Sequence, residues 1–98
     1  MSYFRVMLSG SGISYPLTDG SDPVIGFFTT RDVRATDTRE AEVKAMELVK
    51  AEWRPGGEYF SANQGALPRL AVEDCFAISA LRGIFGRKPS GYAFYTSE

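Results

Sequence analysis

The chain has 98 residues, of which 44% are hydrophobic and 13% aromatic, and its formal net charge is −1. This size fits one domain, covering residues 1–98, that buries a single core, and the composition argues against disorder. The small net charge gives no global basic field that would attract nucleic acid. The absence of histidine excludes Ser-His-Asp and Cys-His catalysis and the usual zinc sites, so we expect no metal and no cofactor.

The location of the protein follows from what the sequence lacks. Cys75 is the single cysteine, so no intramolecular disulfide can form, which fits a reducing compartment. No run reaches the ~18 apolar residues of a membrane span. The N-terminal residues have no basic segment followed by a long apolar core, which a signal peptide requires. We therefore expect a cytoplasmic protein that does not bind membranes.

The first elements in the chain are a strand and a loop. Residues 3–9 alternate, with Phe4, Val6 and Leu8 on one face, and predict a strand. Residues 10–23 read GSGISYPLTDGSDP, and this content of glycine, serine, aspartate and proline predicts a loop. We expect the loop to connect two antiparallel strands.

Residues 24–35 predict the second strand, and one residue in it is anomalous. Alternation places Arg31 on the same face as Phe27 and Val33, which belong in the core. A buried arginine is costly unless it is paired or a bulge turns it outward. Arg31 is therefore a candidate site residue.

A helix follows over residues 37–53. Asp37 is a good N-cap, and Glu40, three residues later, completes a pattern that resembles a capping box. The sequence from residue 54, RPGG, ends the helix because proline cannot continue it. One half of the helix carries its apolar residues and the other half is charged, which predicts one buried stripe. The stripe consists of Ala41, Ala45, Met46, Leu48, Val49 and Trp53.

The remainder of the chain predicts two more strands. Residues 58–68 form a polar loop with two aromatics, residues 69–81 a long third strand, residues 82–91 a glycine-rich basic loop, and residues 92–96 a short last strand. The order is therefore β-β-α-β-β. The fold class that we expect is α+β, an antiparallel sheet of about four strands with one amphipathic helix packed on one face.

The first candidate site joins Arg31 to the acidic pair Glu73 and Asp74. If the strands lie close together, the arginine and a carboxylate could hold a substrate, which would make a histidine-free enzyme. The favoured interpretation is a structural ion pair or an arginine that reaches the sheet edge. Asp32, Glu73 and Asp74 could also bind a hard cation, although their spacing does not require it.

The second candidate site is the basic loop. Arg82, Arg87 and Lys88 could contact phosphates, and Phe85 could stack on a base. The alternative is a solvated loop, which we favour because there are only three cations in a slightly acidic chain. Nucleic-acid or phosphate-ligand binding therefore stays an alternative.

The second face of the sheet is the third candidate. One helix cannot cover both faces of a four-stranded sheet. Alternation leaves Met7, Phe28, Ala77 and Leu81 on the face without the helix. An apolar patch of this kind most often marks a partner surface, which favours a homodimer or a docking module.

Two stretches resemble known sequences. The run VRATDTREAEVKA, with the pattern V-x-A-x-[DST]-x-x-E-A, resembles strand-to-helix junctions of HicB-like antitoxins and small ferredoxin-like proteins. The run GFFTTRDVRA resembles a set of small uncharacterised bacterial proteins, in which an aromatic-Thr-Thr-Arg strand enters such a helix. That set has no assigned activity. Because the chain has no helix-turn-helix or second ribbon-helix-helix segment, a repressor role is not implied.

The function predicted from these observations is a small non-enzymatic interaction module. It would act through a protein partner and associate with itself. The two alternatives above, a nucleic-acid binder and a histidine-free enzyme, remain open at this point.

Overall fold

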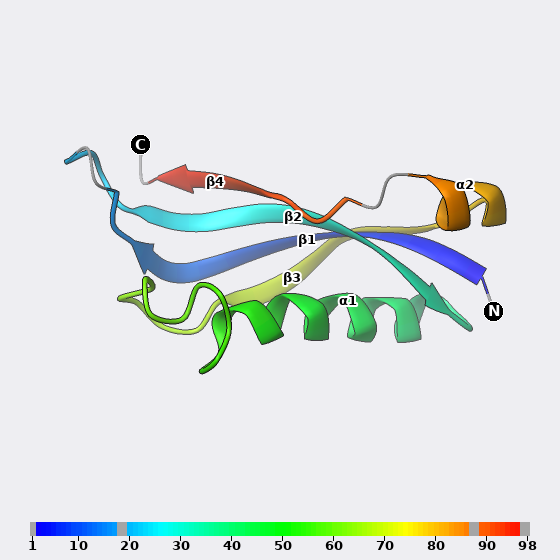
Figure 1. Cartoon of the computed structure of the whole chain (residues 1–98), viewed down its shortest axis with the longest axis horizontal. Coiled ribbons are helices and arrows are strands. Elements are labelled where there is room, and N and C mark those ends of the chain that lie inside the picture. Colours follow the sequence, from blue (N-terminus) through cyan, green and yellow to red (C-terminus); the bar gives the residue numbers. More distant parts are fainter. Residues whose placement is uncertain (1, 18–19, 87–88, 97–98) are drawn as a thin grey trace.

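A computed structural model describes residues 2–17, 20–86 and 89–96. Its elements are β1 (Ser2–Tyr15), β2 (Val24–Ala35), α1 (Thr38–Trp53), β3 (Arg69–Ile78), α2 (Ala80–Phe85) and β4 (Tyr92–Thr96). The strands form one antiparallel sheet in the order β3-β1-β2-β4, which confirms the predicted α+β class. Figure 1 shows α1 along one face of the sheet and the short α2 on the opposite side, near the N-terminus.

The start of α1 forms as predicted. The Asp37 side chain accepts a hydrogen bond from the Glu40 backbone N–H at 2.8 Å. The Glu40 carboxylate accepts in return from the backbone N–H of Thr36 at 3.1 Å. These bonds satisfy donors that the first helical turn leaves without a partner. The helix entry directly after β2 therefore fixes where α1 crosses the sheet.

The core lies between α1 and the sheet face that it covers. Four helix residues at helical spacing are buried against alternating residues of the two long strands. At 1.5 Å per residue, α1 spans about 24 Å, whereas the molecule is 44 Å long. The segment after α1 covers the rest of this face. The buried apolar residues are Phe4, Val6, Leu8, Ile13, Val24, Phe27, Val33, Ala35, Ala41, Ala45, Val49 and Trp53.

The loop predicted from residue 10 begins later, because β1 continues to Tyr15. Gly10 pairs directly with Phe27, and the ring of Phe27 occupies the space that a Cβ at Gly10 would need. The glycine therefore provides room for a core aromatic and does not mark a turn. Further along β1, Ser14 accepts from Gln64 N–H at 2.8 Å and Gly12 accepts from Ala66 N–H at 3.1 Å. These contacts tie the segment after α1 to the end of β1.

The third strand is shorter than predicted and changes face partway. The β1–β3 register shifts between Met7 and Leu8, so the β3 residue Glu73 is an extra residue in the pairing. Such a bulge reverses the alternation that a strict period of two assumes. Strand β3 ends at Ile78, and residues 80–85, which we predicted as strand and loop, form α2 with Ser79 as its N-cap. The Ser79 hydroxyl accepts from Arg82 N–H at 3.1 Å.

Candidate functional site

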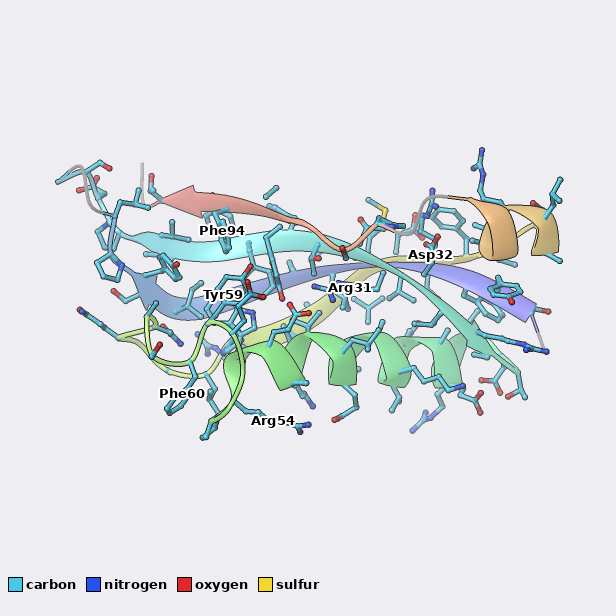
Figure 2. The ribbon with its side chains drawn as sticks, in the orientation of Figure 1. Arg31, Asp32, Arg54, Tyr59, Phe60 and Phe94 are labelled. Carbon is cyan, nitrogen blue, oxygen red and sulfur yellow. The ribbon has the colours of Figure 1, made fainter. Side chains whose placement is uncertain are left out.

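Arg31 lies between the sheet and α1, where the sequence placed it, and is only 5% exposed (Figure 2). Its partner is Glu52 near the end of α1, with Nη1 and Nη2 at 3.0 and 3.1 Å from the two carboxylate oxygens. Its Nε donates to the Thr29 hydroxyl at 3.2 Å. Two parallel hydrogen bonds to a carboxylate are the strongest pairing available to a guanidinium. The arginine on the core face is therefore paired, and no bulge turns it outward.

Aromatic residues complete the surroundings of this ion pair. The Arg31 guanidinium lies 5.3 Å from the centre of the Tyr92 ring. The Tyr92 hydroxyl donates a short hydrogen bond to Glu52 and accepts one from Trp53 Nε1 at 3.2 Å. The Thr29 hydroxyl donates to the Gly91 carbonyl at 2.8 Å. Among the described residues that are not exposed, every buried polar side-chain atom has a partner. We call the set Arg31, Glu52, Tyr92, Trp53 and Thr29 the Arg31 network.

The electrostatics of the Arg31 network are those of a satisfied structural pair. Burial lowers the pKa of Arg31, but the hydrogen bonds with Glu52 and the nearby charges outweigh it, so the pKa is raised. Burial likewise raises the pKa of Glu52, but the bonds from Arg31 and Tyr92 outweigh it, so this pKa is lowered. Burial and the Glu52 carboxylate raise the pKa of Tyr92. Each shift favours the protonation state that the network already uses at neutral pH.

The lowered pKa of Glu52 predicts an acid-sensitive stability. A carboxylate whose folded pKa lies below its unfolded value of about 4.3 stabilises the fold above that pH, and the contribution disappears as pH falls through the folded pKa. We expect urea unfolding to show a Glu52→Gln variant less stable than the wild type at neutral pH, with the difference shrinking as the pH falls below the unfolded pKa of about 4.3. Because only Glu52 is changed, comparing the variant with the wild type separates its contribution to stability from that of Glu40, whose pKa is also lowered. A difference that is the same at neutral and at acidic pH would contradict the prediction.

The structure does not bring Arg31 together with Glu73 and Asp74. The Glu73 carboxylate accepts from the Ser9 hydroxyl at 2.6 Å, and Asp74 accepts from its neighbour's backbone N–H at 2.9 Å. Asp74 pairs with Met7, whereas Arg31 pairs with the next residue of β1, Val6. Since successive strand residues point to opposite faces, the two carboxylates and Arg31 lie on opposite sides of the sheet. The site that a histidine-free enzyme would need is not formed by these residues.

Asp32 has a partner of its own on the face opposite α1. Its carboxylate accepts from Arg5 Nε and Nη2 at 2.8 and 2.9 Å, and its side chain is 2% exposed. In Figure 2, Arg31 lies on the α1 side of the sheet and Asp32 towards α2. Within the described ranges, no group of three or more histidine, cysteine, aspartate or glutamate side chains is arranged to hold a metal ion. Asp32, Glu73 and Asp74 therefore do not converge.

The basic loop is only partly described. Arg82 is exposed in α2, and the Phe85 side chain lies outside the described part of the structure. Arg87 and Lys88 lie outside the described residues. The nucleic-acid hypothesis therefore stays a prediction from sequence.

The sheet face opposite α1, which we call the open face, carries large apolar side chains on all four strands. Met7, Phe28, Phe76 and Tyr95 are each at least one-third exposed, and Phe28 is 52% exposed. The rings of Phe28 and Tyr95 lie 5.6 Å apart across β2 and β4. A depression of about 720 Å³ lies beside them, with Arg5, Met7 and Phe76 in its floor and residues 89–91 at its rim. This face is amphipathic and accessible.

Two of the residues predicted for this face lie elsewhere. Ala77 pairs with the buried residue Phe4, so the bulge in β3 places it on the α1 side. Leu81 belongs to α2 and is 70% exposed. Since neighbouring strand residues alternate, placing Ala77 on the open face implied a core position for Phe76, but Phe76 lies on the open face, opposite Arg5. The physical reason is the same register shift, which reverses the faces of all residues of β3 after Glu73.

Sequence reasoning missed Glu52 and Tyr92, and a signal existed for the first. Glu52 lies three residues after Val49 and seven after Ala45, on the flank of the buried stripe. An acid beside the buried stripe of a helix and an arginine on a core face of a strand each need a partner of opposite charge, and each can be that partner for the other. Nothing in the sequence placed Tyr92 beside either residue, because its strand is short and its pairing with β2 is distant in the chain.

No protein-family model, curated protein or solved structure matches this chain. In the described part of the chain, neither helix is long and apolar enough to cross a bilayer. The site must therefore be interpreted from its own geometry.

Proposed function

We propose that the protein is a small non-enzymatic interaction module that acts through a protein partner and self-associates. The observation that carries the proposal is the open face, where Met7, Phe28, Phe76 and Tyr95 expose apolar side chains. An exposed apolar patch of this extent is typical of a protein-binding surface. Its aromatic residues are those that contribute most to binding energy in known interfaces.

The charged residues that were candidates for a catalytic or metal site are paired within the chain, which supports a non-enzymatic role. The Arg31 network is closed on itself beneath the sheet, and Asp32 is paired with Arg5. The acidic side chains Glu73 and Asp74 each have a partner. A cytoplasmic location, expected from the single cysteine and from the N-terminal residues, is part of this proposal.

The proposal predicts that Phe28→Asp abolishes partner binding without unfolding the chain. Immobilised wild type, Phe28→Asp and a control, Leu67→Asp, are compared for the proteins that they retain from cells of the source organism. Leu67 is as exposed as Phe28, at 53%, but follows α1 and is not part of the open face. We expect at least one protein bound by the wild type and the control and reduced roughly thirtyfold with Phe28→Asp, as for an interface hot spot.

Circular dichroism shows whether both variants keep the wild-type fold. If all three proteins retain the same partners in the same amounts, the open face is not the binding surface and the proposal fails.

A further inference from the structure

The second half of the β2 edge, next to α1, is not paired with any strand in the described part of the chain. Strand β4 pairs with β2 only from Val24 to Thr29. From Thr30 to Ala35, β2 pairs with β1 on one side, and none of the described residues pairs with it on the other. A free edge of six residues presents backbone N–H and C=O groups that another strand can bind. One of these groups, the Arg34 carbonyl, accepts from Lys44 Nζ at 2.7 Å, which anchors α1 alongside this edge.

An apolar groove lies along the same edge. It has a volume of about 480 Å³ and runs between β2 and the flank of α1. Val43 and Leu48 line it and are 51% and 47% exposed, although they belong to a helix whose outer side is otherwise charged. Val33 and Ala51 complete its apolar wall. This edge, which no described strand pairs, shares Val33 and Arg34 with the apolar groove, so the two form one continuous surface, distinct from the open face.

We propose that this surface binds a second copy of the chain, with the two β2 edges paired antiparallel about a two-fold axis at Val33. The proposal deepens the self-association in the proposed function and rests on it. A two-fold axis that pairs two antiparallel edges runs perpendicular to the sheet, so paired residues share a face. The result is one sheet of eight strands with both α1 helices on the same side.

Charge selects this register. Centring the axis on Val33 places Asp32 of one copy beside Arg34 of the other, twice, on the open-face side. Centring it on Asp32 would instead oppose two aspartates, which destabilises a strand pair. In the Val33 register Arg34 of the second copy would leave its place over the Tyr3 ring and approach Asp32, whose side chain is 2% exposed and remains paired with Arg5 of its own chain. The edge is therefore complementary to itself.

The same two-fold axis at Val33 also fills the apolar groove. The axis at Val33 brings the flank of one α1 opposite the flank of the other, running in the opposite direction. The apolar residues Val43 and Leu48 of each copy then line a shared groove from both sides. The open faces of the two copies lie on the other side of the eight-stranded sheet, where they remain free for a partner.

The experiment is sedimentation velocity on the full chain over a concentration series, with four variants. Arg34→Glu places an acid beside Asp32 of the second copy, and Leu48→Glu puts a charge into the groove. Both residues are solvent-exposed or partly so, and we expect each variant to raise the dimer dissociation constant at least tenfold. Leu67→Asp, which is about as exposed as Leu48 and lies in neither the groove nor the open face, is the matched control and should dimerise like the wild type.

The register is tested by cysteine crosslinking in a Cys75→Ser background. Val33→Cys places two cysteines directly opposite each other on the axis, within reach of a disulfide, whereas Thr36→Cys places them far apart. We expect oxidation to link two copies only for Val33→Cys.

Three results would overturn the proposal. These are a wild type that stays monomeric, a dimer that resists both Arg34→Glu and Leu48→Glu, and a dimer that only the fourth variant, Phe28→Asp on the open face, dissociates. The last result would assign self-association to the open face. A monomeric wild type would assign these edge charges the opposite role, that of keeping strands from pairing. Partner capture by the open face would stand or fall separately.

Discussion

Replacing Glu52 with methionine is expected to lower the free energy of unfolding by about 3 kcal/mol. The change leaves the Arg31 guanidinium, which is 5% exposed, without its carboxylate. Removing one partner of a buried pair typically costs about 3–5 kcal/mol, because a charge stays buried and unpaired. We expect the lower end of that range, because the Glu52 side chain is 31% exposed and water can reach one side of the pair.

Two further variants separate this effect from a general loss of helix stability. Glu47→Met, on the exposed side of α1, breaks only surface ion pairs at 3.7 and 3.9 Å and should change stability by less than about 0.5 kcal/mol. The double variant Arg31→Met, Glu52→Met should recover most of the stability, since apolar residues often replace a buried pair at little cost. Urea unfolding measures all three. A double variant no more stable than Glu52→Met alone would contradict a simple structural pair.

Replacing Trp53 with alanine should lower the free energy of unfolding by about 4 kcal/mol. Trp53 is fully buried, and its ring stacks between Phe27, with centroids 5.2 Å apart, and Tyr59, at 4.8 Å. The substitution creates a cavity and removes the surface on which the segment after α1 packs. For a domain whose total stability lies in the range of about 5–15 kcal/mol, this is a large fraction.

The effect of Trp53→Ala is measured by urea unfolding followed by circular dichroism, because the variant has no other tryptophan. Trp53→Phe should be clearly milder, since it keeps most of the stacking and loses the Nε1 hydrogen bond to Tyr92. Equal losses for the two variants would show that the hydrogen bond, and not the ring packing, dominates at this position.

The fold class could be predicted from the sequence because its main signals are local. The N-cap at Asp37, the alternation of β2 and the stripe of α1 each involve residues close in the chain. The structure confirms them except at Leu48, which was predicted in the buried stripe and is 47% exposed. The errors arose where a distant residue decides the local structure. Gly10 belongs to a strand because Phe27 covers it, and Phe76 faces away from α1 because of a register shift opposite Met7 and Leu8.

The candidate site was predicted less completely, for the same reason. Alternation was sufficient to show that Arg31 lies on a core face and needs a partner. Choosing Glu52 over Glu73 or Asp74 required the strand order and the bulge, neither of which has a local signature. The free edge of β2 likewise follows from the length of β4 and its pairing with the first half of β2.

Sedimentation velocity of the wild-type chain from micromolar to submillimolar concentration tests most directly the claim that this protein works by association. The account predicts a shift from monomer to a dimer as the concentration rises, at neutral pH and moderate salt. A single monomeric species at every concentration would contradict it.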